Sequence, residues 1–150
     1  MTDKASAGCI DPESFNDETF TRCGYDRQLK YIWAGVMLMN LDYWREKDLT
    51  RRVVEWGFEN NDRIKFPDQD TINYLCRENK IVLPLRFGVI GGYYYMDVMY
   101  TDEYLDQLKE CLTNPAIIHY AGQAPWKIEL SNHLQQDIWE KYNNMLAHPA

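Results

Sequence analysis

The sequence predicts an α/β protein that forms a single domain over residues 1–150, and three observations support this prediction. A chain of 150 residues has the usual length of one domain. Hydrophobic residues make up 45% of it, which is enough to build a core. Apolar runs typical of strands, about four of them, alternate with segments of helical periodicity. The alternation favours the α/β class and leaves an α+β arrangement open.

The N-terminal part of the chain is expected to hold two strands. Residues 1–8 are small and polar, and we expect them to be disordered. A short strand is predicted over 7–10, followed by irregular backbone with a helical turn over 11–28. The run 31–40 is continuously apolar, which is typical of a buried strand.

Three helices are predicted next, over 41–48, 49–61 and 68–76. The candidate N-caps are Asn40 or Asp42 for the first helix and Asp48 or Thr50 for the second. The third helix follows Pro67, and Asp68 is expected to cap it.

The rest of the chain mixes strands and helices. The predicted elements are two extended pieces over 80–89 hinged at Pro84, an aromatic loop over 88–100, a helix over 101–114 capped by Thr101, a strand over 115–122 ending in a glycine turn, and an amphipathic helix over 131–146.

Composition excludes several classes of function. The net charge of −7 argues against a nucleic-acid-binding surface, which needs clustered Lys and Arg. No apolar run reaches the length of a transmembrane segment. The four cysteines form no CxxC pair and no signal peptide precedes them, so we expect reduced thiols in a cytoplasmic protein.

Two aspartates flank a glutamine in "DQD", residues 68–70. As a cap and a first-turn acid, Asp68 and Asp70 would each contribute roughly 0.5–2 kcal/mol to helix stability. A carboxylate at the start of a helix also accepts hydrogen bonds from sugar hydroxyls, and the Gln69 amide both donates and accepts. Both interpretations stay open for Asp68, whereas Asp70 is assigned to supporting the helical turn.

His119 is the histidine with the most suggestive context. A lone histidine is more often structural than a ligand. His119, however, ends an apolar strand, where α/β proteins place ligand-contacting groups. Gly122 follows in a turn that would let backbone N–H groups approach a phosphate. The aromatic tract 93–95 either packs in the core or stacks on a sugar.

Five stretches together resemble the family 8 glycosyltransferases, in order and in approximate spacing. They are "AGVMLMNLDYWRE", "FPDQDTINYL", "LPLRFGV", "IIHYAGQAPWK" and "SNHLQQDIWEKY". Any one of them alone would be weak evidence, and their shared order makes the resemblance specific. The resemblance covers roughly residues 7–142.

The resemblance implies a GT-A fold and the retaining transfer of a hexose from UDP-glucose or UDP-galactose to a glycan acceptor, often in lipopolysaccharide synthesis. A manganese or magnesium ion would offset the charge that develops on the UDP leaving group. By position, the resemblance assigns catalytic roles to Asp68 and Gln69, donor binding to Ala34, Gly35, Gly122 and Lys127, and metal binding to His119.

Three departures from the family pattern qualify this expectation. The upstream Asp-x-Asp metal motif has no equivalent, Trp33 replaces an asparagine, and Ala124 stands where a lysine usually precedes Pro-Trp. We therefore expect the C-terminal half of a glycosyltransferase, lacking the nucleotide-binding half and binding its metal weakly. A partner chain or an oligomer would cover the missing half. The alternative is an inactive fragment that serves as a sugar-binding or interaction module.

Overall fold

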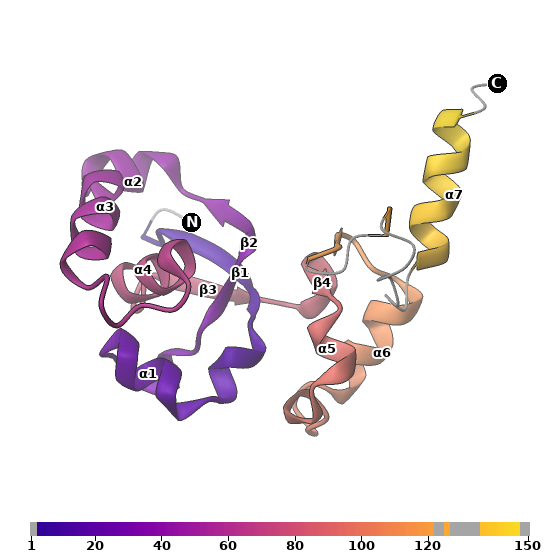
Figure 1. The fold of residues 1–150 in the computed structure, drawn as a ribbon, viewed down its shortest axis with the longest axis horizontal. Helices are drawn as coiled ribbons and strands as arrows, with labels where there is room; N and C mark the ends of the chain where they lie inside the picture. The colour runs from indigo at the N-terminus through magenta and orange to yellow at the C-terminus, as the bar shows by residue number, and fades with distance from the viewer. Residues whose placement is uncertain (1–2, 122–124, 127–135, 148–150) are drawn as a thin grey trace.

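The computed structural model describes residues 3–121, 125–126 and 136–147 (Figure 1). Its strands are β1 (Ser6–Ile10), β2 (Ile32–Met39), β3 (Lys80–Leu83), β4 (Val89–Ile90) and β5 (Ile118–His119). Its α-helices are α1 (Asp17–Cys23), α2 (Leu41–Glu46), α3 (Leu49–Glu59), α4 (Pro67–Leu75), α5 (Gly92–Tyr95), α6 (Leu105–Thr113) and α7 (Gln136–Ala147). Short 3-10 turns lie at Pro12–Phe15, Arg27–Leu29, Leu85–Phe87 and Asp97–Met99.

The larger sheet has three strands in the order β2-β1-β3. The central strand β1 runs antiparallel to β2 and parallel to β3, with Ser6 opposite Met39 on one side and Lys80 on the other. All five residues of β1 are buried, as expected for a strand with neighbours on both edges. The expectation that residues 1–8 are disordered is therefore wrong for 6–8, which form the first part of this strand.

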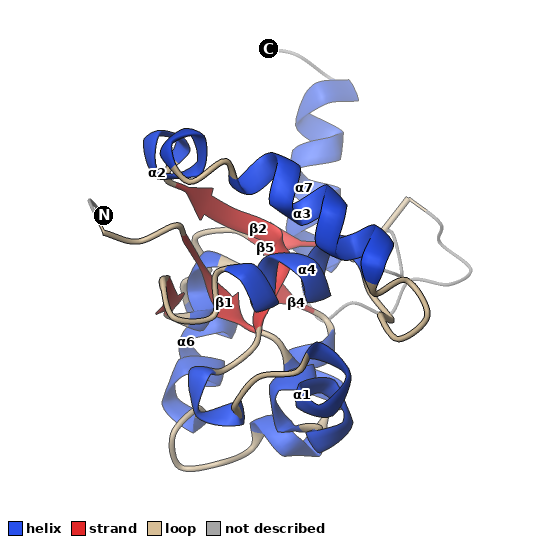
Figure 2. Cartoon of the chain, turned by 90° about the vertical axis from the view of Figure 1, so that its left-hand side faces the viewer, coloured by secondary structure: helices blue, strands red, loops and turns tan. Residues whose placement is uncertain are grey.

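Helix α4 is fixed to β2 by the side chain of Asn73, which is fully buried. Its Oδ1 accepts from the Ile32 N–H at 2.8 Å, and its Nδ2 donates to the Ile32 carbonyl at 2.8 Å and the Gln69 carbonyl at 3.0 Å. Helix α3 packs beside α4 (Figure 2), where the rings of Trp56 and Tyr74 stack with centroids 4.5 Å apart. The position of α4, and thus of "DQD", depends on these contacts.

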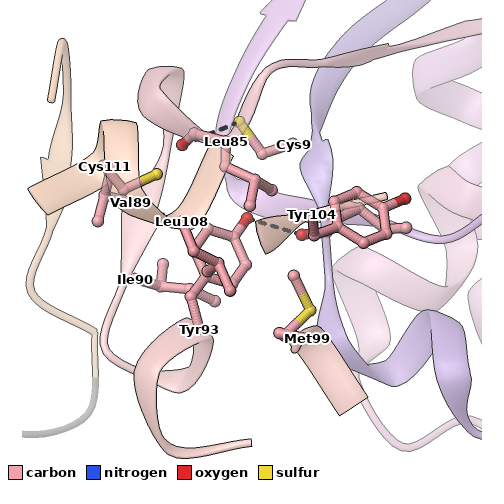
Figure 3. Packing of buried hydrophobic residues seen from close by; sticks show 10 residues of the cluster. Cys9, Leu85, Val89, Ile90, Tyr93, Met99, Tyr104, Leu108 and Cys111 are labelled. Atoms are coloured by element: carbon pink, nitrogen blue, oxygen red, sulfur yellow. Dashed lines mark hydrogen bonds between the residues drawn. The ribbon is translucent and has the colours of Figure 1, made fainter. Parts of the chain in front are cut away.

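A hydrophobic core joins the end of β1 to the segments that follow β3 (Figure 3). Tyr93 lies at its centre, fully buried, and its hydroxyl donates to the Ile10 carbonyl at 2.7 Å. Tyr93 belongs to α5, so the prediction of a loop over 88–100 is wrong there. Of the two interpretations of the aromatic tract, packing is correct for Tyr93.

Two predicted helix caps are wrong. The N-cap of α4 lies two residues earlier than expected, at Phe66, so Asp68 lies inside the first turn. Helix α6 starts after Tyr104, so Thr101 does not cap it. Asn40 caps α2 as predicted, since its Oδ1 accepts from the Tyr43 N–H.

The C-terminal helix α7 agrees with the predicted helix over the part of it that the structure describes, and residues 131–135 lie outside that part. Among the described residues, no helix combines the length and apolar character needed to cross a membrane.

Candidate functional site

Gln69 links three segments of the chain through its side-chain amide. The residue is buried in α4. Its Oε1 accepts from the backbone N–H of Ala34 at 2.9 Å, and its Nε2 donates to Oδ2 of Asp11 at 3.2 Å. Oδ1 of Asp11 in turn accepts from the Glu13 N–H at 2.7 Å. Both ends of the amide are therefore occupied, which fixes its orientation and ties α4 to β2 and to the end of β1.

Asp11 belongs to this site, and sequence reasoning missed it. Its side chain is buried, and burial raises the pKa of the carboxyl group to about 6, although hydrogen bonds from the Glu13 N–H and from Gln69 oppose the rise. The signal in the sequence was its position directly after the strand 7–10, because strand ends carry ligand-contacting groups in α/β proteins.

The raised pKa of Asp11 predicts a specific pH dependence of stability. Between the usual value of 3.8 and about 6, the carboxyl is protonated in the folded chain and ionised in the unfolded chain. Its contribution is fully present below pH 3.8 and is lost as the pH rises through about 6. The loss is at most about 3 kcal/mol. The variant Asp11→Asn cannot ionise and serves as the reference. The difference in free energy of unfolding, wild type minus variant, should fall as the pH is raised from about 4 to about 7, and urea titrations at each pH measure it. A carbon NMR titration that places the Asp11 midpoint below 4 would contradict this.

Trp33, Gly35 and His119 form the second part of the site. Trp33 and Gly35 lie two residues apart on β2 and so face the same side of the strand. The Trp33 indole Nε1–H donates to Nδ1 of His119 at 3.2 Å, with the ring centroids 5.6 Å apart and the planes at 64°. The bare Cα of Gly35 lets these two rings meet, since a Cβ there would lie 2.5 Å from the indole nitrogen and 2.7 Å from His119 Nδ1.

Gly35→Ala is therefore expected to lower the free energy of unfolding by about 1–3 kcal/mol, the usual cost of overpacking. The matched control is Gly57→Ala in α3, where a Cβ would meet only Thr71 Oγ1 at an ordinary 3.5 Å. This control should raise stability by about 0.5–1 kcal/mol through helix propensity. Urea denaturation of both variants measures the difference. Equal urea midpoints for the two variants would contradict this expectation, because they would show that β2 and His119 separate to admit the added methyl group at no cost.

The structure thus brings together Ala34, Gly35, Gln69 and His119 around β2, but it separates Asp68 from them. Asp68 is exposed and lies on a groove of about 320 Å³ between α3 and α4. The apolar lining of this groove includes Val53, Val54, Phe58 and Ile64. Gly122 and Lys127, the other predicted donor-binding residues, lie outside the described residues.

Asp70 does more than support the helical turn. It accepts from the backbone N–H groups of Lys65 and Phe66, which is the expected helix-start role. Its fully buried carboxylate also pairs with the Arg22 guanidinium through two hydrogen bonds of 3.1 Å and accepts from the Tyr31 hydroxyl. Asp70 therefore joins α4 to α1 and to Tyr31, the residue directly before β2.

The sequence model of Glycosyl transferase family 8 matches residues 5–129, which is most of the chain. The chain belongs to glycosyl transferase family 8. Among the relatives of this family 8 chain, a probable glycosyl transferase Gly of Streptococcus gordonii is 26% identical over 113 residues, and an Escherichia coli lipopolysaccharide 1,2-glucosyltransferase is 24% identical over 148 residues. These matches cover 75% and 95% of this chain.

Solved structures agree on the α/β fold of this family 8 chain. The galactosyltransferase LgtC, crystallised with donor and acceptor sugar analogs, matches 93% of the chain with a TM-score of 0.78 and 23% identity. The chain spans 51% of LgtC, 42% of the E. coli glucosyltransferase and 15% of the streptococcal protein. The chain therefore corresponds to about half of the length of LgtC and to a smaller share of the longer relatives.

A divalent metal ion is generally required in family 8, and the described residues do not fit one. The lone pair on Nδ1 of His119 is occupied by the indole N–H of Trp33. Within the described ranges, no group of three or more His, Cys, Asp or Glu side chains is placed to hold a metal ion. Manganese needs several oxygen or nitrogen ligands, so this part of the chain does not provide its site.

Proposed function

We propose that this family 8 chain contributes the sugar-contacting part of a hexosyltransferase that uses UDP-glucose or UDP-galactose. The transfer would retain the anomeric configuration, and the acceptor would be a glycan of the lipopolysaccharide type. Membership of the family and the names of the relatives support this proposal. The observation that carries it is the convergence of Ala34, Gly35, Gln69 and His119 around β2.

The chemistry that these residues offer is recognition of hydroxyl groups at a rigid strand. The amide of Gln69 is held at both ends, so the backbone of Ala34 keeps a fixed position for a ligand. Asp68 lies apart from this cluster, exposed on the groove between α3 and α4, where its carboxylate would be a second point of contact for sugar hydroxyls. A partner chain or another copy would supply the nucleotide-binding half and the metal ligands. We also propose that the assembly acts in the cytoplasm.

Saturation-transfer NMR with UDP-glucose, UDP-galactose and UDP tests this proposal. We expect the hexose protons to receive magnetisation from the protein, and Asp68→Asn to weaken binding of the UDP-sugars more than binding of UDP. The matched control is Asp62→Asn, another exposed aspartate on the loop before α4. A hexose ring that gives no signal at millimolar concentration would contradict the proposal.

One observation favours the second candidate, an inactive module that binds sugar or another protein. The Trp33–His119 hydrogen bond removes the histidine that the family uses for its metal. This candidate predicts that the chain binds hexose equally well with and without UDP. It also predicts that adding manganese does not change the affinity.

A further inference from the structure

We propose that Trp33 holds His119 in the neutral tautomer that carries its proton on Nε2, and thereby keeps His119 from binding a metal ion. Trp33 is then a positioning residue, and His119 is a hydrogen-bond donor toward ligand oxygens. The inference concerns the chain's own hydrogen bonding, so it holds whether or not the proposed function is correct.

The direction of the Trp33–His119 hydrogen bond follows from chemistry. An indole nitrogen only donates, so Nδ1 of His119, 3.2 Å away, must be the acceptor. A neutral imidazole has one donor and one acceptor nitrogen, and the acceptor is already used. The remaining nitrogen, Nε2, carries the proton and has no lone pair for a metal ion. Binding a metal would require breaking the hydrogen bond to Trp33 or moving the proton.

The surrounding backbone fixes both rings. Trp33 lies on β2, next to Ala34, whose N–H is held by Gln69. His119 pairs with Ile90 in the small sheet, and its carbonyl accepts from the Ala121 N–H at 2.8 Å. Both rings pack closely against Gly35, where an added Cβ would lie 2.5 Å from the Trp33 indole nitrogen and 2.7 Å from Nδ1 of His119.

The described residues also supply few further ligands for a cation at this place. Among the described residues, no cluster of acidic, cysteine and histidine side chains gathers around His119. The buried carboxylate of Asp11 is occupied by the Glu13 N–H and by Gln69. An Nε2–H donor instead suits an anionic or carbonyl oxygen of a ligand.

The test is NMR of the full chain labelled with nitrogen-15 in its histidines, using two-bond nitrogen–proton correlations and His119→Gln to assign the signal. We expect wild type to show His119 as a single tautomer protonated on Nε2. Trp33→Phe removes the donor and keeps an aromatic ring, so it should give a mixture of both tautomers. The matched control, Trp126→Phe at an exposed tryptophan, should leave the wild-type spectrum unchanged.

Titration with manganese chloride gives a second readout. Paramagnetic broadening of the His119 signals should need about tenfold more Mn²⁺ in wild type than in Trp33→Phe, the ratio expected from losing one hydrogen bond. A wild-type proton on Nδ1, an unchanged tautomer in Trp33→Phe, or equal broadening in both proteins would overturn the proposal. The wild-type spectrum decides the tautomer even if Trp33→Phe does not fold.

Discussion

Replacing Asp70 with Asn is expected to lower the free energy of unfolding by about 3–5 kcal/mol, the usual cost of breaking a buried ion pair. The side chain of Arg22 is 9% exposed and that of Asp70 is fully buried. An amide cannot accept two charge-assisted hydrogen bonds from the guanidinium together with those from Tyr31 and the backbone. Arg22 would lose its shorter, fully buried carboxylate partner and keep only the ion pair with Glu13 at 3.3 Å. Urea denaturation at pH 7 measures the loss.

Asp68→Asn is the control for Asp70, because it makes the same chemical change two residues away at an exposed site in the same helical turn. Its effect should stay within about 0.5 kcal/mol. If Asp70→Asn and Asp68→Asn lower the free energy of unfolding equally, the loss comes from removing a negative charge near the N-terminus of α4 and not from breaking the ion pair with Arg22.

Asp70 also predicts a loss of stability in acid. Burial would raise the pKa of its carboxyl group, but the hydrogen bonds from Arg22, Tyr31 and two backbone N–H groups outweigh burial and hold the pKa below 3.8. Its contribution is therefore present above pH 3.8 and is lost as the pH falls through the lowered pKa of the folded chain. Asp11 acts in the opposite direction between pH 3.8 and about 6, so the two groups are separable by their variants.

Asn73→Ala is expected to cost about 2–4 kcal/mol, the second largest effect. The substitution leaves the N–H and the carbonyl of Ile32 without their side-chain partners in a buried place and opens a cavity between α4 and β2. Thermal and urea unfolding both report the loss. Because the same helix carries Gln69, the variant should also weaken any hexose binding.

Asn144→Ala in α7 is the matched control for Asn73, since it makes the same change in an exposed part of a helix. Alanine has the higher helix propensity, so stability should stay equal or rise by a few tenths of a kcal/mol, roughly. A loss in the Asn73 variant no larger than in this control would show that α4 is held to the sheet by other contacts.

The sequence allowed most of the strands and helices to be predicted, because their patterns are local. The apolar run at 31–40 predicted the strand β2, and the helical spacing behind Pro67 predicted α4. The expectation that this strand is buried is wrong, because β2 lies at the edge of the sheet and most of its residues are half-buried or exposed. The segment 88–100 was misjudged because its glycine pair, Gly91-Gly92, favours a loop locally. Burial of Tyr93 against the Ile10 carbonyl, far away in the sequence, instead supports a short helix there.

The sequence pointed to several residues of the candidate site, and their roles stay a prediction. Gln69, Ala34, Gly35 and His119 were found through a resemblance in sequence, and the structure brings them together. Local spacing could not show that Asp70 pairs with Arg22, 48 residues before it, or that Asp11 meets Gln69, 58 residues after it. Partners at such distances in the sequence leave no periodic signal.

The central position of β1 has a consequence for how the chain is made. Ser6 leaves the ribosome well before Lys80, the residue with which it pairs in parallel. Until Lys80 emerges, the nascent chain can form only the antiparallel pair with β2, and one edge of β1 stays open to other molecules. Chaperones that shield exposed strands should therefore raise the yield of folded protein most while residues 10–80 are being translated.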